Sequence, residues 1–146
     1  MTKQTLANLE MPLISVIIPT YNRPAYLKEA IASVVGQTYP KLEIIVSDDG
    51  RDDRPQPIVD SFQDARLRLR RNPQNLGIGL NATHAFTEAT GKYVASLNDD
   101  DRWDKTFLEK LVQPLEENPE LALAFCDYYV MDDRGTVSWP ATKNHS

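Results

Sequence analysis

The sequence predicts an α/β fold with a mostly parallel sheet flanked by helices. Short apolar runs rich in β-branched residues alternate with segments whose apolar positions recur at helical spacing. Strands that alternate with helices are typical of parallel sheets with right-handed crossovers. Polar residues also cluster where three of the apolar runs end, and ligands of such sheets bind beyond the carboxyl ends of the strands. The same pattern therefore predicts a binding site along one rim.

The first two predicted strands enclose an amphipathic helix. Residues 13–18 are apolar, largely β-branched and followed by Pro19, which suits a strand buried on both faces. Residues 24–36 start with a proline in the first turn, carry apolar side chains at helical spacing and end at Gly36. Residues 42–47 predict a second buried strand. These segments make one βαβ unit.

The rest of the chain continues the alternation. Residues 66–70 alternate between arginine and leucine, which predicts a strand with one basic face at the edge of the sheet. The apolar run at residues 121–131 predicts a fifth strand, and residues 132–135 a hairpin-like turn into residues 136–139. The other expected elements are a short helix at 55–62, a turn-rich loop at 75–79, a helix at 80–89, a strand at 92–97 and a helix at 105–117.

Composition indicates one globular domain and excludes several classes of function. Of 146 residues, 41% are hydrophobic and 25% are charged, which is typical of folded domains rather than disordered chains. The net charge of -5 argues against nucleic acid as a partner, because phosphate backbones need clustered lysine and arginine. The only cysteine is Cys126 and the only histidines are His84 and His145, too few for a disulfide or a structural zinc site. Any metal is therefore expected to be held by oxygen.

The sequence also suggests where the protein acts. It has no apolar run of the ~20 residues that span a bilayer, and its start lacks the pattern of a signal peptide. We therefore expect a cytoplasmic protein. The arginines at residues 66–71 could attract anionic lipid and bring it to the inner membrane face. The alternative, which we favour, is a solvated edge strand that resists aggregation.

The three polar clusters at strand ends are the candidate functional residues. They lie at residues 19–22, 48–50 and 98–101, and the last contains three consecutive aspartates. Crowded like charges cost energy, so a fold that places them at a strand end usually has a cation there. The competing interpretations are a solvated acidic loop at 98–101 and a simple strand-ending turn at 48–50. Convergence of all three clusters on one rim favours a binding site.

Five sequence blocks resemble the signature motifs of family 2 glycosyltransferases. Together, in this order and over nearly the whole chain, they make the resemblance specific. It implies the GT-A fold, a Rossmann-like nucleotide-diphospho-sugar transferase domain, and transfer of a sugar from a nucleotide donor with inversion. A role in cell wall or polysaccharide synthesis would follow. The blocks are Ser15–Arg23, Ser33–Pro40, Glu43–Gly50, Asn75–Gly77 and Asn98–Trp103.

The resemblance implies which residues bind the nucleotide. Pro19 and Tyr21 would lie along the base, with the tyrosine ring as a stacking surface. Asp49, supported by Asp48, would accept a hydrogen bond from the ring N–H of the base, which favours a UDP- or dTDP-sugar. The resemblance assigns two further residues to the same donor site, Asn22 and Asn81.

The aspartate run falls where the family carries its Asp-x-Asp motif. Asn98 and Asp99 would contribute to the nucleotide site, with Asp99 near the ribose. Asp100 would bind the divalent metal that bridges the two phosphates, and Asp101 would assist it. Carboxylate oxygens suit Mg²⁺ or Mn²⁺, and such an ion neutralises charge on the departing diphosphate.

Two departures from the family pattern qualify this expectation. Asn98 stands where aspartate is usual and removes one negative charge, and residues 79–81 lack the basic residue usual there. The family's general base lies beyond the Asp-x-Asp strand, and no residue here matches it. We therefore expect residues 1–146 to be a single GT-A-like domain truncated before its acceptor-binding half, with no catalytic residue assigned.

The acceptor is not identified by these residues, and a saccharide, a lipid-linked sugar or a protein would each be compatible. Two other functions stay open. One is a non-catalytic nucleotide-sugar-binding module of the same fold. The other is a nucleotidyltransferase, which ranks last because residues 19–23 contain no glycine, whereas that class carries a glycine-rich loop after its first strand.

Overall fold

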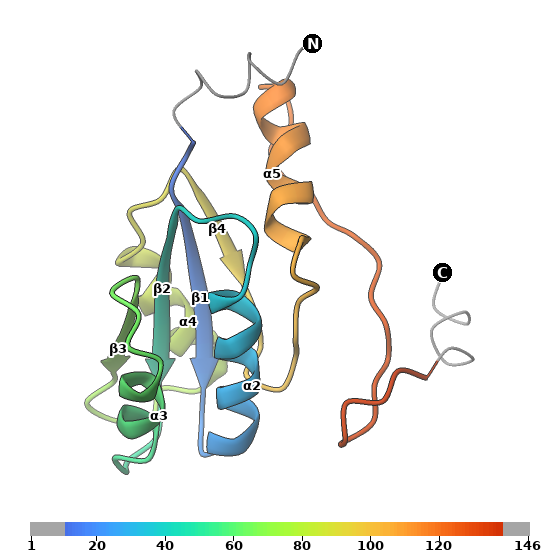
Figure 1. Cartoon of the computed structure of the whole chain (residues 1–146). Helices are drawn as coiled ribbons and strands as arrows, with labels where there is room; N and C mark the ends of the chain where they lie inside the picture. Colours follow the sequence, from blue (N-terminus) through green and yellow to red (C-terminus); the bar gives the residue numbers. More distant parts are fainter. Residues whose placement is uncertain (1–10, 139–146) are drawn as a thin grey trace. The chain divides into compact units, whose positions relative to one another are not determined.

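A four-stranded parallel sheet forms the centre of the computed structural model, which describes residues 11–138 (Figure 1). Its order is β3-β2-β1-β4, and both neighbours of β1 run parallel to it. The predicted α/β fold with a parallel sheet is confirmed. The strands are β1 (Ile14–Thr20), β2 (Leu42–Asp48), β3 (Leu67–Arg71) and β4 (Tyr93–Ser96).

Three helices connect the strands and cover both faces of the sheet. The helices α2 (Pro24–Val35) and α3 (Pro55–Ser61) lie on one face, and α4 (Ile78–Thr87) lies on the other (Figure 1). This change of face follows from the strand order, because the chain moves outward from β1 through β2 to β3 and then crosses to β4. The change of direction falls between β1 and β4, the kind of position where such sheets bind ligands.

The two central strands are buried because they are packed on both faces. Every residue of β1 is buried, and in β2 only Glu43 is partly exposed. On the face covered by α4, Ile17 and Ile45 pack against Ala85. Full burial of an isoleucine side chain contributes roughly 1.5–3 kcal/mol. The two strands that end in the polar clusters at residues 19–22 and 48–50 are therefore the most firmly packed.

The basic strand lies at the edge of the sheet, as predicted, and its arginines are paired within the chain. Arg68 and Arg70 both donate to Glu88, at 2.8 and 2.7 Å. Arg71 bridges Asp48 and Asp53. These pairs use much of the positive charge that residues 66–71 would otherwise offer to a lipid surface.

The chain divides into two compact units, one ending at Leu108 and the other beginning at Glu109. Helix α5 (Phe107–Glu117) starts at the end of the first unit and runs into the second. All candidate site residues lie in the first unit. Within residues 11–138, no helix is long and apolar enough to cross a membrane.

The predicted fifth strand is wrong. Residues 121–130 form no strand, and the side chains of Leu123 and Phe125 are 66% and 83% exposed. A strand needs a neighbour that pairs its backbone groups along its length. The four-stranded sheet of residues 11–138 does not include this run, whose last residue, Val130, accepts a backbone hydrogen bond from Ser138. The turn that follows is present, because Met131 forms an antiparallel bridge with Val137. Trp139, the last residue of the expected hairpin, lies outside the described residues.

Candidate functional site

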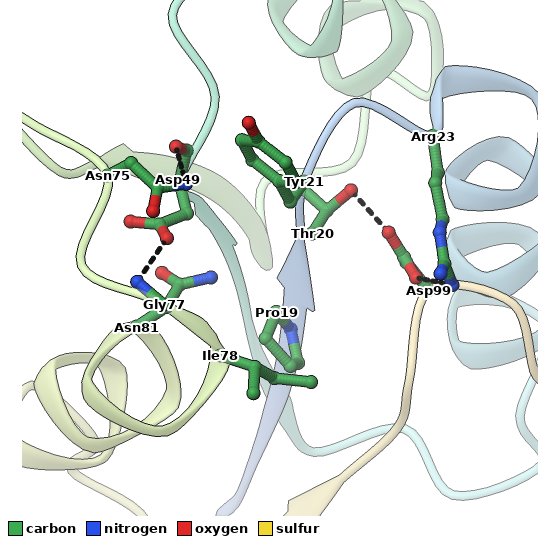
Figure 2. Close-up of a pocket in the computed structure, with 10 residues that line it drawn as sticks. All are labelled: Pro19, Thr20, Tyr21, Arg23, Asp49, Asn75, Gly77, Ile78, Asn81 and Asp99. Carbon is green, nitrogen blue, oxygen red and sulfur yellow. Dashed lines mark hydrogen bonds and ion pairs between the residues drawn. The ribbon is translucent and has the colours of Figure 1, made fainter.

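A pocket of about 350 Å³ lies at the carboxyl ends of β1, β2 and β4 (Figure 2). Its volume falls within the range of small-molecule sites. It brings together parts of all three polar clusters and the loop before α4, as the pattern of strand ends predicted. The residues that line it are Pro19, Thr20, Tyr21, Arg23, Asp49, Asn75, Gly77, Ile78, Asn81 and Asp99.

The end of β1 gives the pocket an aromatic wall. Pro19 and Thr20 are buried in the strand, whereas Tyr21 is 51% exposed and offers one ring surface to the pocket. The next residue, Asn22, has a φ of 55°, a left-handed conformation that asparagine tolerates better than most residues. Asn22 does not line the pocket. It turns the chain from β1 toward α2.

Asp49 joins β2 to the loop before α4. Its carboxylate is buried and accepts hydrogen bonds from the side chain of Asn72 at 2.8 Å and from the backbone N–H groups of Leu76 and Gly77 at 2.9 and 2.8 Å. Asn75 donates to the backbone carbonyl of Asp49 at 3.4 Å. The N–H of Leu76 also lies 3.1 Å from the second carboxylate oxygen, so each oxygen of Asp49 accepts two of the contacts that hold this loop.

A network of buried polar side chains contacts Asp49 through Asn72. Asn72 donates to both Asp49 and Asn81. The side-chain oxygen of Asn81 also accepts from the Ser47 hydroxyl at 2.6 Å, and its amide donates to the Ser47 carbonyl at 2.8 Å. Arg70 donates to Ser47 and Asn72. Asn81 therefore lines the pocket with an amide whose oxygen is already satisfied.

Asp48 faces away from the pocket. Its carboxylate accepts from the backbone N–H of Gly50 at 2.8 Å and from Arg71 at 2.9 Å. Asp49, the residue after β2, lines the pocket, whereas Asp48 does not. Asp48 fixes the turn after β2 and the end of β3, and any effect it has on the pocket acts through that turn.

Asp99 is the member of the aspartate run that points into the pocket. Thr20 donates to its carboxylate at 2.7 Å, and Arg23 lies 3.5 Å from it. Burial raises the pKa of this carboxyl above its usual range, and the neighbouring charge of Asp100 raises it further. Hydrogen bonds from Thr20 and from the backbone of Tyr21, together with the charge of Arg23, act in the opposite direction on this pKa.

The other members of the run, Asn98, Asp100 and Asp101, do not line the pocket. Asp100 is 47% exposed and accepts a hydrogen bond from Arg23 at 2.7 Å. Asn98 donates to the side chain of Asp101 at 3.1 Å, and the backbone N–H of Asp101 donates to the carbonyl of Asn98. Asn98 and Asp101 therefore close a turn that contains Asp99 and Asp100.

The donor atoms around Asp100 suit a hard divalent cation. Within residues 11–138, no group of three or more histidine, cysteine, aspartate or glutamate side chains could hold a metal ion. The nearby side chains offer carboxylate oxygens, which fit Mg²⁺ or Mn²⁺. Mg²⁺ in particular is usually bound by one or two carboxylates together with substrate phosphates and water. Asp100 and its neighbours therefore offer ligand atoms of the right kind, but the described side chains are too few to hold an ion without further ligands.

Several lining residues were not assigned from the sequence. Thr20 and Arg23 stand beside assigned residues, and their contacts with Asp99 join positions 79 and 76 residues apart. Arg23 could have been predicted from its position in the loop between the first strand and the following helix. Asn72 carried no motif, and only the folded structure reveals that it contacts Asp49.

The parallel sheet with a pocket at its carboxyl edge is an arrangement of the GT-A type, and comparison with known proteins agrees. The chain is 30% identical to S. aureus TarS 1-349 in complex with UDP-GlcNAc, with a TM-score of 0.67 over 71% of this chain and 31% of that one. The mannosyltransferase PcManGT from Pyrobaculum calidifontis, in complex with GDP-Man and Mn²⁺, is 27% identical, with a TM-score of 0.66 over 73% of this chain and 33% of that one.

The sequence comparisons identify the family. The model of glycosyl transferase family 2 matches residues 15–143, and the chain belongs to this family. It is 35% identical over 127 residues to the putative teichuronic acid biosynthesis glycosyltransferase TuaG of Bacillus subtilis (strain 168). That match covers 86% of this chain and 50% of TuaG. The chain thus spans about half the length of that relative.

Proposed function

We propose that the pocket binds the nucleotide diphosphate of a sugar donor and that the chain carries the donor-binding part of an inverting glycosyltransferase. The observation that carries this proposal is the meeting of Tyr21, Asp49 and Asp99 in one pocket at the carboxyl ends of three parallel strands. An aromatic face suits a base, and the two carboxylates suit its ring N–H and the ribose hydroxyls. The UDP-GlcNAc complex of TarS supports this reading.

The position of Asp49 in the pocket supports uracil or thymine as the base. Its carboxylate lines the pocket together with Tyr21, so it would accept the single ring N–H of these bases while the ring stacks on Tyr21. A UDP- or dTDP-sugar is therefore the proposed donor. Guanine also carries a ring N–H and PcManGT was solved with GDP-Man, so GDP is the comparison that tests this preference.

Mg²⁺ or Mn²⁺ is the proposed cofactor, held by Asp100 with Asp101 beside it. When bound, such an ion supplies electrostatic stabilisation of the departing diphosphate. Asp99 would orient the ribose, since Thr20 and the backbone of Tyr21 hold its carboxylate in place. Asn98 would act indirectly by closing the turn onto Asp101.

The sugar acceptor and the group that activates it stay unassigned. We assign no carboxylate among residues 11–138 as the general base. The alternative function is a module that binds the nucleotide sugar without catalysis. Transfer or hydrolysis of a UDP-sugar by this chain would decide between the two.

Calorimetric titration with UDP, in the presence and absence of Mn²⁺, tests the proposal. We expect binding that strengthens when Mn²⁺ is present and that loses this dependence in Asp100→Ala. Asp60→Asn, an exposed carboxylate on α3, serves as the matched control and should bind as the unmodified chain does. Absence of UDP binding under both conditions would refute the proposed function.

A further inference from the structure

Arg23 is the only cation among the described residues that line the pocket. Asp49 and Asp99 line it as well, and Asp100 lies beside it. A nucleotide diphosphate would bring more negative charge into a partly dehydrated space where like charges repel. Residues 79–81 provide no basic side chain. The charge balance of the pocket therefore depends on Arg23.

In the structure the guanidinium of Arg23 is paired with two carboxylates. Its Nη1 atom lies 2.7 Å from Asp100 and 3.5 Å from Asp99 (Figure 2 shows the contact with Asp99). The side chains of Arg23 and Asp100 are 52% and 47% exposed. Ion pairs at such exposure are weak because water competes for both partners. The contact with Asp100 can therefore be exchanged at little cost.

We propose that Arg23 is an exchangeable counter-cation that pairs with Asp100 before the donor arrives and binds the donor's diphosphate once a divalent ion has taken Asp100. This inference rests on the proposed function. A guanidinium presents several N–H donors in a planar fork that matches phosphate oxygens. Arg23 also follows Tyr21 by two residues, so one short loop would carry both the stacking ring and the phosphate contact.

The exchange has two consequences of opposite sign. Without the guanidinium, Asp99 and Asp100 lose a competitor, so Mn²⁺ alone should bind more tightly. The diphosphate loses a charged partner at the same time, so UDP should bind less tightly when Mn²⁺ is saturating. A residue that only maintained the fold would weaken both kinds of binding together.

The experiment measures two affinities by calorimetry, for Mn²⁺ alone and for UDP at saturating Mn²⁺, using the full chain. Arg23→Gln should bind Mn²⁺ several-fold more tightly and UDP about 10-fold more weakly, the size expected for loss of one charge-assisted hydrogen bond. Arg23→Lys should keep most of the UDP affinity. Arg51→Gln removes the same charge from an exposed position outside the pocket and should change neither affinity.

The variants separate this inference from the proposed function. If the unmodified chain binds UDP with Mn²⁺ and Arg23→Gln binds it equally well, only the role of Arg23 is refuted. If Arg23→Gln weakens both affinities, the residue is structural and the exchange is refuted. If the unmodified chain does not bind UDP at all, the proposed function and this inference are both refuted.

Discussion

The carboxylate of Asp49 accepts a hydrogen bond from the backbone N–H of Gly77 at 2.8 Å. This contact joins the end of β2 to the residue that precedes α4, and Gly77 has a φ of 82°. Because both residues line the pocket, the same side chain that would meet the base also shapes the loop around it. Asp49 therefore has a structural role as well as the proposed binding role.

Asp49→Asn tests this double role. The amide keeps the size of the side chain but removes the charge and replaces one acceptor with a donor that faces backbone N–H groups. Hydrogen bonds to charged groups contribute about 1.5–3 kcal/mol, so we expect roughly 10- to 100-fold weaker UDP binding. We also expect a lower free energy of unfolding, measured by urea titration. Unchanged values of both would mean that neither role is correct.

Gly77→Ala tests the conformation of the loop. A Cβ at this position would meet no atom within 4 Å, so its effect comes from the positive φ of 82° alone. The backbone at φ 82° and ψ 160° lies in a region that is essentially restricted to glycine and costs another residue about 1–3 kcal/mol, which should appear as reduced stability and weaker UDP binding. Gly79→Ala is the control, because it also has open space and lies inside α4. There alanine should stabilise the chain by up to about 1 kcal/mol; equal destabilisation by both variants would contradict this explanation.

Asn72→Ala tests the network behind Asp49. The substitution removes one donor each to Asp49 and Asn81, whose oxygens keep their contacts with Leu76 and Ser47. Hydrogen bonds to charged groups contribute about 1.5–3 kcal/mol, so we expect a loss of about this size in the free energy of unfolding. Asn75→Ala should have a much smaller effect on stability, because its contact with the Asp49 carbonyl is 3.4 Å long. Chemical denaturation of the two variants side by side gives the comparison.

Thr20→Val tests the ionisation of Asp99. Burial raises the pKa of this carboxyl above 3.8, and the Thr20 hydroxyl lowers it. The variant should therefore raise the pKa further, which carboxyl-carbon NMR can follow. Because the folded pKa exceeds the unfolded value, ionised Asp99 reduces stability at higher pH, and this loss disappears as pH falls below 3.8. The stability deficit of Thr20→Val should accordingly shrink on acidification, and a constant deficit would contradict the assignment.

The fold was largely predictable because its signals are local. The buried runs that became β1 and β2 and the alternating arginines of β3 each carry a periodic pattern that their own residues define. The run at 121–131 has an equally apolar pattern, but strand formation also requires a partner. The run does not join the four-stranded sheet of residues 11–138, so the local pattern was not sufficient.

The site was predictable in outline but not in its contacts. Strand ends placed Tyr21, Asp49 and Asp99 on one rim, which required only the topology. The contact between Arg23 and Asp100 joins residues 77 positions apart, and no spacing in the sequence reports it. The direction of each aspartate was also hidden, because adjacent carboxylates at a strand end point to different sides.

A crystal structure of the chain with UDP and Mn²⁺ tests directly whether this pocket binds the nucleotide. We expect the base to stack on Tyr21 with its ring N–H on Asp49, the ribose to lie at Asp99, and the ion to lie at Asp100 beside the diphosphate. Nucleotide bound on another face, or in this pocket without contact to Tyr21 and Asp49, would contradict it.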